Sequence, residues 1–356
     1  MLLSRDARRF HVLLHAVPAI LCAAVIAGQV RAQESTSDEI LMPRVMPPMP
    51  EGMSAPTNAA LLYGRAMRLI SSEALGAMGE KDPKTDEPTD RAREAIQSYG
   101  SSLSVARRAS RLARSDWGIE YQQGPGALVD HAGPFRGLWR ALDNEAAILT
   151  KSEPDRAVEN VVAMLSMSEH ITQDRILLSS LVGAAMSSGS VKRLNAMMDA
   201  GIVTRKNAAE LLAGLERVRD LDLFRLREAM ANEKWTASEW LRAVGTGPDA
   251  GRRVADLLAM LVAEDADELL DALALMDERQ IAPLFDETAR AYDDMIAAFD
   301  APDPAAELER ISDAIGAGEY GVVAMRFAAS LTRAYTSAER VSGEIDAAIK
   351  RLQAMK

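Results

Sequence analysis

The sequence predicts an all-α protein of about ten helices packed as antiparallel pairs, in a helical bundle or an irregular α-solenoid. From residue 57 onward, apolar residues recur three or four positions apart, which is typical of one buried face of a helix. No convincing alternating pattern of a β-strand interrupts them. The composition is 48% hydrophobic but only 4% aromatic, which is typical of a soluble helical protein rich in Ala and Leu.

The N-terminal segment, residues 1–32, has the features of a secretory signal peptide. Three arginines precede an apolar run from Val12 to Gly28, and the residues before the predicted cleavage point after Ala32 suit a signal peptidase. We therefore expect a protein of the periplasm or one that is secreted. Retention of the run as a membrane anchor is the alternative, although the run is near the lower length limit for spanning. No second apolar span follows, so we expect no stable membrane insertion after cleavage.

Cleavage would make the chain more acidic and free of cysteine. The formal net charge would fall from -11 to about -14, and the one cysteine, Cys22, would be lost. Nucleic acids and anionic membranes repel such a chain, so we expect neither as a partner. Disulfides and thiolate chemistry are also excluded from the mature protein. We expect an envelope protein as the partner, and the oligomeric state stays open.

Residues 33–56 form a Met- and Pro-rich arm. Five prolines between positions 43 and 56 disfavour a helix and favour an extended chain. Thioethers spaced three or four residues apart suit copper(I), which is a soft ion. The candidate ligands are Met42, Met46, Met49 and Met53. The alternative is a pliable apolar arm that lies on the body of the protein.

The helical part divides at a glycine-rich stretch. We expect a helical domain over 57–244, a linker over 245–251 and a C-terminal helical region over 252–356 that could pack with the preceding domain. The linker contains two glycines spaced as in dinucleotide-binding loops, but it follows a predicted helix and not a strand. A second break or kink is expected at 220–222, where two aspartates flank a leucine.

The segment from Ser115 to Gly126 is a loop in which aromatic, acidic and glycine residues gather. Together with a nearby histidine it supplies the candidate binding residues, which are Asp116, Trp117, Gly118, Glu120, Gly124, Pro125 and His131. One interpretation is a pocket in which the acidic residues and the histidine act as acid and base, with the tryptophan as a wall. The other interpretation is structural, with the tryptophan in the core and the glycines shaping the turn.

Two further groups of charged residues are candidates. Arg107, Arg111 and Arg114 share one face of a predicted helix and could hold an anionic ligand, or they could form a solvated face paired with the protein's own carboxylates. His170 and Asp174 lie four residues apart, which suits a pair of metal ligands or a surface ion pair.

The side-chain chemistry of the sequence favours a protein that is not an enzyme. Only His131 and His170 would remain after cleavage, which excludes zinc sites built from several histidines or cysteines, and the usual hydrolase and phosphate-loop motifs are absent. We expect no cofactor and an interaction or scaffold protein that offers a helical groove to its partner. The alternative is a small-ligand-binding protein or a hydrolase with its site at the 116–131 loop. A deep pocket would favour the alternative, and a long shallow groove the scaffold.

Three short motifs carry a resemblance to known proteins. They are Asn58-Ala59-Ala60-Leu61-Leu62-Tyr63, then Asp116-Trp117-Gly118-Ile119-Glu120, then Gly124-Pro125 with His131. In these motifs and in its helical order the chain resembles a group of exported α-helical proteins of unknown function found in planctomycete-type bacteria. The resemblance covers most of residues 57–335. It implies export and a helical fold, and it implies no activity.

Overall fold

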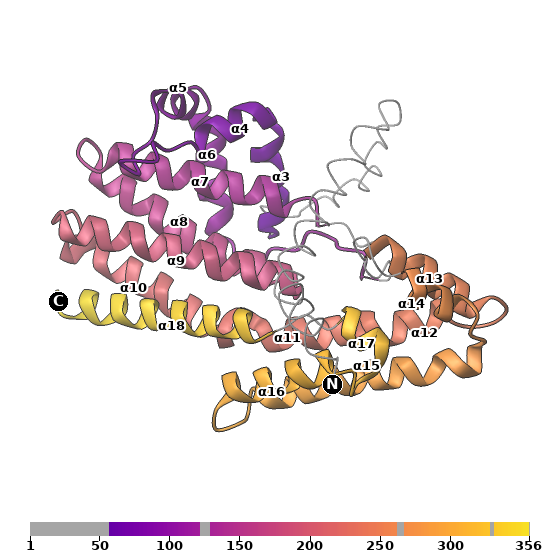
Figure 1. Ribbon diagram of the computed structural model, residues 1–356. Coiled ribbons are helices and arrows are strands. Elements are labelled where there is room, and N and C mark those ends of the chain that lie inside the picture. Colours follow the sequence, from indigo (N-terminus) through magenta and orange to yellow (C-terminus); the bar gives the residue numbers. More distant parts are fainter. Residues whose placement is uncertain (1–56, 122–128, 262–266, 328–330, 356) are drawn as a thin grey trace. The chain divides into compact units, whose positions relative to one another are not determined.

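The computed structural model describes residues 57–121, 129–261, 267–327 and 331–355 (Figure 1). Within these ranges the protein is helical and has no strand, which confirms the predicted all-α class, with more helices than the ten expected. No helix in the same ranges is both long enough and apolar enough to cross a membrane. The predicted signal peptide and the arm with Met42, Met46, Met49 and Met53 lie outside the described residues.

The described residues form two compact units, and the second interrupts the first in sequence. The first unit spans 57–233 and 333–355 and contains α3 (Ala59–Arg68), α4 (Ser72–Met78), α5 (Asp90–Ser98), α6 (Gly100–Ser110), α7 (Ala132–Leu149), α8 (Pro154–Thr172), α9 (Leu177–Asp199), α10 (Arg205–Arg219), most of α11 (Asp222–Trp235) and α18 (Thr332–Gln353). The second unit spans 234–332 and contains the π-helical η2 (Thr236–Trp240), α12 (Leu241–Val244), α13 (Ala250–Leu261), α14 (Asp267–Ala274), α15 (Glu278–Ala298), α16 (Pro304–Gly316) and α17 (Gly321–Phe327).

Helix α8 lies between two apolar clusters of the first unit. On one side Met164 packs in a cluster with α3, α4, α6 and α7, whose largest buried side chains include Tyr63 and Phe135. On the other side Leu165 packs in a cluster with α9, α10 and α18. A helix covered on both sides needs apolar or small residues around most of its surface, and α8 has them. The C-terminal end of α8 is therefore packed on both sides, and the residues that follow it, Gln173 and Asp174, line a cavity.

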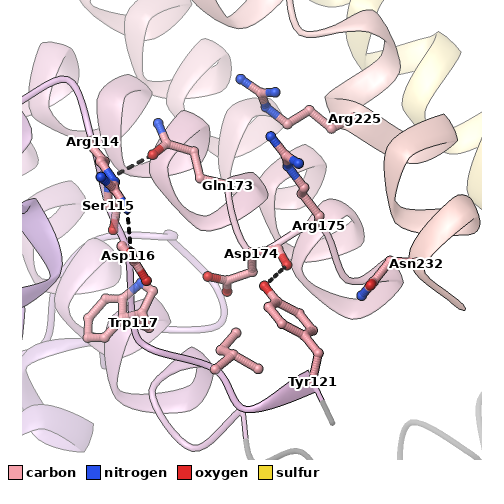
Figure 2. A pocket seen from close by; sticks show the side chains of 11 residues that line it. Arg114, Ser115, Asp116, Trp117, Tyr121, Gln173, Asp174, Arg175, Arg225 and Asn232 are labelled. Atoms are coloured by element: carbon pink, nitrogen blue, oxygen red, sulfur yellow. Dashed lines mark hydrogen bonds and ion pairs between the residues drawn. The ribbon is translucent and has the colours of Figure 1, made fainter. Parts of the chain in front are cut away.

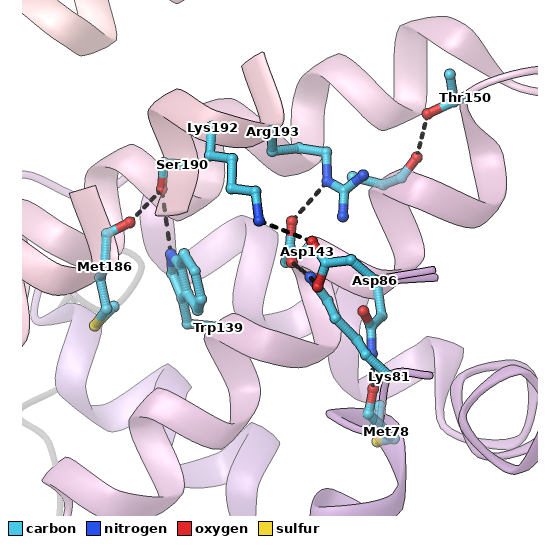
Figure 3. Close-up of polar contacts among 12 residues, drawn as sticks. Met78, Lys81, Asp86, Trp139, Asp143, Thr150, Met186, Ser190, Lys192 and Arg193 are labelled. Atoms are coloured by element: carbon cyan, nitrogen blue, oxygen red, sulfur yellow. Dashed lines mark hydrogen bonds and ion pairs between the residues drawn. The ribbon is translucent and has the colours of Figure 1, made fainter. Parts of the chain in front are cut away.

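Helices α7 and α9 approach closely and are joined by polar contacts (Figure 3). A Cβ atom added at Gly189 of α9 would lie 2.4 Å from the Trp139 ring of α7, so only glycine allows this spacing. Next to it, the Trp139 Nε1 donates to the Ser190 Oγ at 3.3 Å. Farther along, Asp143 of α7 forms an ion pair of 2.7 Å with Arg193 of α9. These contacts fix α9, and hence the turn that precedes it.

The break predicted at 220–222 is confirmed, and it is a left-handed turn. The φ angles are 43° at Asp222, 49° at Leu223, 61° at Phe224 and 58° at Arg225. Left-handed backbone costs roughly 1–2 kcal/mol per L-residue, so four in succession cost on the order of 4–8 kcal/mol. Phe224 is only 2% exposed and packs in the α8–α9–α10–α18 cluster, and this burial offsets part of the cost.

The stretch 245–251, expected as a linker between domains, lies within the second unit, where its two ends are buried and Thr246, Pro248 and Asp249 are exposed. A Cβ atom at Gly251 would lie 2.1 Å from the backbone oxygen of Leu273, so the glycine allows α13 to approach α14. Ala250 beside it is buried in the apolar cluster of this unit. The compact units divide instead between residues 233 and 234 and between 332 and 333. Gly245 and Gly251 allow close packing here, whereas the sequence was interpreted as a linker between domains.

Candidate functional site

The first unit contains a cavity of about 490 Å³ where three segments meet (Figure 2). The segments are the extended chain after α6, the turn between α8 and α9, and α11. The residues that line the cavity are Arg114, Ser115, Asp116, Trp117, Ile119, Tyr121, Gln173, Asp174, Arg175, Arg225 and Asn232. Asp116 and Trp117 were expected from sequence, whereas Glu120 and His131 are not among the lining residues. Gly124 and Pro125 lie outside the described residues.

Two side-chain amides hold the extended segment in place. Asn58, which caps α3, donates from Nδ2 to the Asp116 backbone oxygen at 2.7 Å and accepts from the Asp116 backbone N–H at 2.9 Å. Gln173 at the end of α8 accepts from the Ser115 N–H at 2.7 Å and donates to the Ala113 oxygen at 3.2 Å. These amides supply the backbone partners that a neighbouring strand would otherwise provide.

Asp116 and Gly118 shape the turn within this segment. The Asp116 Oδ1 accepts from the Gly118 N–H at 3.0 Å, and its Oδ2 pairs with Arg114 at 2.7 Å. Gly118 has a φ of 69°, which glycine adopts without steric cost. The carboxylate therefore has a local partner on each oxygen. Glu120, two residues further on, is exposed.

His131 lies against Trp117 and is bound to a buried aspartate. The two rings are stacked, with centroids 4.3 Å apart and planes 14° from parallel. The His131 Nε2 is 2.8 Å from the Asp174 Oδ2, and the Ser179 Oγ donates to the same oxygen at 2.9 Å. Because Ser179 donates to the carboxylate, it is not placed as a nucleophile that His131 could activate. The cavity does not collect Asp116, Glu120 and His131 as an acid–base group.

The prediction that His170 and Asp174 act as a metal pair or a surface ion pair is wrong. Both are buried, at 1% and 3% exposure, and Asp174 binds His131. The His170 Nε2 lies 2.8 Å from the Leu112 carbonyl oxygen, so Nε2 carries the proton and Nδ1 accepts from the Tyr63 hydroxyl at 2.9 Å. Burial lowers the pKa of His170 to about 4, and burial also raises the pKa of Tyr63, with Glu169 contributing.

Arg107, Arg111 and Arg114 are paired with the protein's own carboxylates, which is one of the two arrangements predicted from the sequence. Arg107 is buried, and its Nη1 is 2.5 Å from Glu145. Arg111 and Arg114 each have an acidic partner as well. The three arginines do not form a uniformly solvated face, because Arg107 is buried and binds Glu145 of α7 and Asn160 of α8. Only Arg114 reaches the cavity.

Two arginines of the cavity were missed by the sequence interpretation, and both have left-handed backbone. Arg175, in the turn between α8 and α9, has a φ of 52°, and Arg225 has 58°. Both bind Glu228 of α11: Arg175 Nε is 3.2 Å from Oε2, and Arg225 Nη1 is 3.1 Å from Oε1 and 3.4 Å from Oε2. A single carboxylate is thus shared by two guanidinium groups. Strained positions of this kind cluster at functional sites, and no local sequence signal marks either one.

Three buried polar atoms of the lining residues have no hydrogen-bond partner. They are the Oγ of Ser115, which is 4% exposed, the Nε1 of Trp117 and the Nε of Arg225. Indole and guanidinium nitrogens can only donate, so at least two of the three need an acceptor. In the described ranges, no group of three or more His, Asp and Glu side chains is arranged to hold a metal ion. The chemistry of the cavity therefore points to an acceptor-rich molecule.

Comparison of the chain with models of known protein families, with curated proteins and with solved structures found no significant match.

Proposed function

We propose that this protein is an exported small-molecule-binding protein whose ligand occupies the cavity of the first unit. The observation that carries the proposal is the set of unpartnered buried atoms on Ser115, Trp117 and Arg225, all at one cavity. Native proteins leave few buried polar groups unpaired, and each unmet donor costs on the order of 1–3 kcal/mol. These atoms are shielded from solvent, so a ligand with acceptor atoms would bond them once the side chains turn toward it, and that bonding would remove the cost.

The size and lining of the cavity support the same proposal. Its volume of about 490 Å³ falls in the range typical of pockets for small molecules. Trp117, Ile119 and Tyr121 supply apolar surface, and the arginines supply charge. The Tyr121 hydroxyl donates to the Asp174 backbone oxygen at 2.5 Å, so this ring is held at the cavity wall. Polar groups that are fixed in place set the orientation of a ligand in a pocket.

The cavity favours the ligand-binding alternative over the scaffold predicted from sequence. The scaffold role for an envelope partner remains a prediction, as does export by residues 1–32. We propose no hydrolase activity, because Ser179 donates to Asp174 and no acid–base group gathers at the cavity. Copper(I) binding by the arm at 33–56 concerns residues outside those that the structure describes.

The test is native mass spectrometry of the protein purified gently from the envelope, followed by a thermal-shift screen. The screen uses a defined library of small organic acids, amines and neutral compounds. A ligand at 100 times its Kd stabilises the folded state by about 2.7 kcal/mol, which is easily seen. Ile119→Trp should fill the cavity and abolish both the retained mass and the thermal shift. Leu69→Trp, at an exposed position outside the lining, is the matched control and should keep both.

The proposal is overturned if no library compound stabilises the wild-type protein and no mass is retained. It is also overturned if Ile119→Trp, once shown to be folded by circular dichroism, binds as well as the Leu69→Trp control.

A further inference from the structure

We infer that the ligand carries a carboxylate, and that this carboxylate binds Arg175 and Arg225 in the place that Glu228 occupies. The inference rests on the proposed function and names the chemical class of its ligand. It makes Glu228 a resident counter-ion that competes with the ligand.

The charges around the cavity leave the two arginines short of acceptors. Arg114 is paired with Asp116, and the Oδ2 of Asp174 is bound by other side chains of the first unit. Arg175 and Arg225 share Glu228 alone among the bonds described for them. The two guanidinium groups thus share a single carboxylate, and an anion that takes its place would serve both.

The bonds of Arg225 point to a planar, two-oxygen anion. Both of its bonds to Glu228 start from Nη1, while its Nε is buried without a partner. A carboxylate that binds arginine in the favourable bidentate geometry uses two neighbouring N–H groups at once. Glu228 does not reach this geometry from its position on α11. A free carboxylate is not tethered to a helix and can satisfy Nε together with a neighbouring N–H after a small rotation of the side chain.

Glu228 can be displaced at little cost. Its side chain is 46% exposed and that of Arg175 is 63% exposed, so water screens their attraction. Once displaced, the Glu228 carboxylate can be solvated. The left-handed backbone at both positions sets the direction in which each arginine side chain leaves the chain. A loosely held carboxylate between two guanidinium groups is suited to exchange for another carboxylate.

The experiment compares acids with their neutral amides on the full protein. The probes are benzoate and phenylacetate, benzamide and phenylacetamide, and inorganic phosphate, with Kd measured by isothermal titration calorimetry. We expect the acids to bind at least 10-fold more tightly than the amides and than phosphate. Arg225→Gln and Arg175→Gln should each weaken acid binding about 10-fold and leave amide binding unchanged. Glu228→Gln should strengthen acid binding about 3-fold or more, because the competing carboxylate is gone.

Arg310→Gln is the matched control, since it removes one positive charge from an exposed pair with Glu307 in the second unit. It should leave every Kd unchanged. Equal binding of acids and amides, tighter binding of phosphate, no binding of either acid, or weaker acid binding in Glu228→Gln would each overturn the carboxylate inference. The proposed function would survive any of these results if library compounds still bind the wild-type protein and not Ile119→Trp. Since Arg225 lies in a strained turn, Arg175→Gln serves as the second variant should Arg225→Gln not fold.

Discussion

His170 should make the protein lose stability as the pH falls from about 6.5 to about 4. The folded state keeps the imidazole neutral, because burial lowers its pKa from 6.5 to about 4. In the unfolded chain the same group takes up a proton near pH 6.5. Since the unfolded state then binds the extra proton, acid favours unfolding throughout this window. Each pKa unit corresponds to about 1.4 kcal/mol, so the whole effect amounts to about 3 kcal/mol at pH 4.

The assay is urea unfolding at several pH values between 7 and 4 for the wild-type protein and His170→Gln. Glutamine offers a donor and an acceptor but does not titrate, so the other ionisable groups cancel in the difference. The free energy of unfolding should fall by about 3 kcal/mol more in the wild-type protein than in the variant. Nitrogen NMR of the imidazole should show the proton on Nε2, facing the Leu112 oxygen, with Nδ1 bound by the Tyr63 hydroxyl.

A difference between the two proteins that stays constant with pH would refute this reasoning. An imidazole that titrates near pH 6.5 in the folded protein would refute it as well.

Two further predictions concern stability. Burial raises the pKa of Glu233, which accepts the Leu177 N–H at 3.4 Å, so the folded state loses stability as the pH rises above 4.5. Glu233→Gln keeps the acceptor and should raise the melting temperature at pH 7 but change it little at pH 4; an equal change at both pH values would contradict this. Gly189→Ala should cost about 1–3 kcal/mol because its Cβ would lie 2.4 Å from Trp139. Gly343→Ala, with nothing within 4 Å, should stabilise α18 by about 0.5–1 kcal/mol. Equal melting temperatures for the two alanine variants would show that the close contact carries no cost.

The helical class was predictable from sequence because it depends on local periodicity. The break at 220–222 was also predictable, since acidic residues next to an interruption of the apolar pattern disfavour a continuous helix. The left-handed backbone of this break was not predictable, because the burial of the Phe224 ring that accompanies it depends on the tertiary cluster. Gly245 and Gly251 were interpreted as part of a linker for a related reason: a close helix contact and a linker use the same residue type.

The cavity could be predicted only in part. Asp116 and Trp117 stand in a conspicuous loop, and the sequence identified them as candidates. Arg175 and Arg225 lie in different segments of the chain, and neither belongs to a recognisable motif, so no spacing rule connects them. They meet because the turn between α8 and α9 lies beside the start of α11, and such an approach is not encoded in any short window of sequence.

The position of α18 has a consequence for how the chain is made. Its residues Val341, Ile345 and Leu352 complete an apolar cluster begun by α8, α9 and α10, more than a hundred residues earlier in the sequence. A ribosome therefore releases most of the first unit long before the helix that closes its core emerges, and an exposed apolar surface persists for that time. The core of the first unit is therefore complete only once α18 has been made.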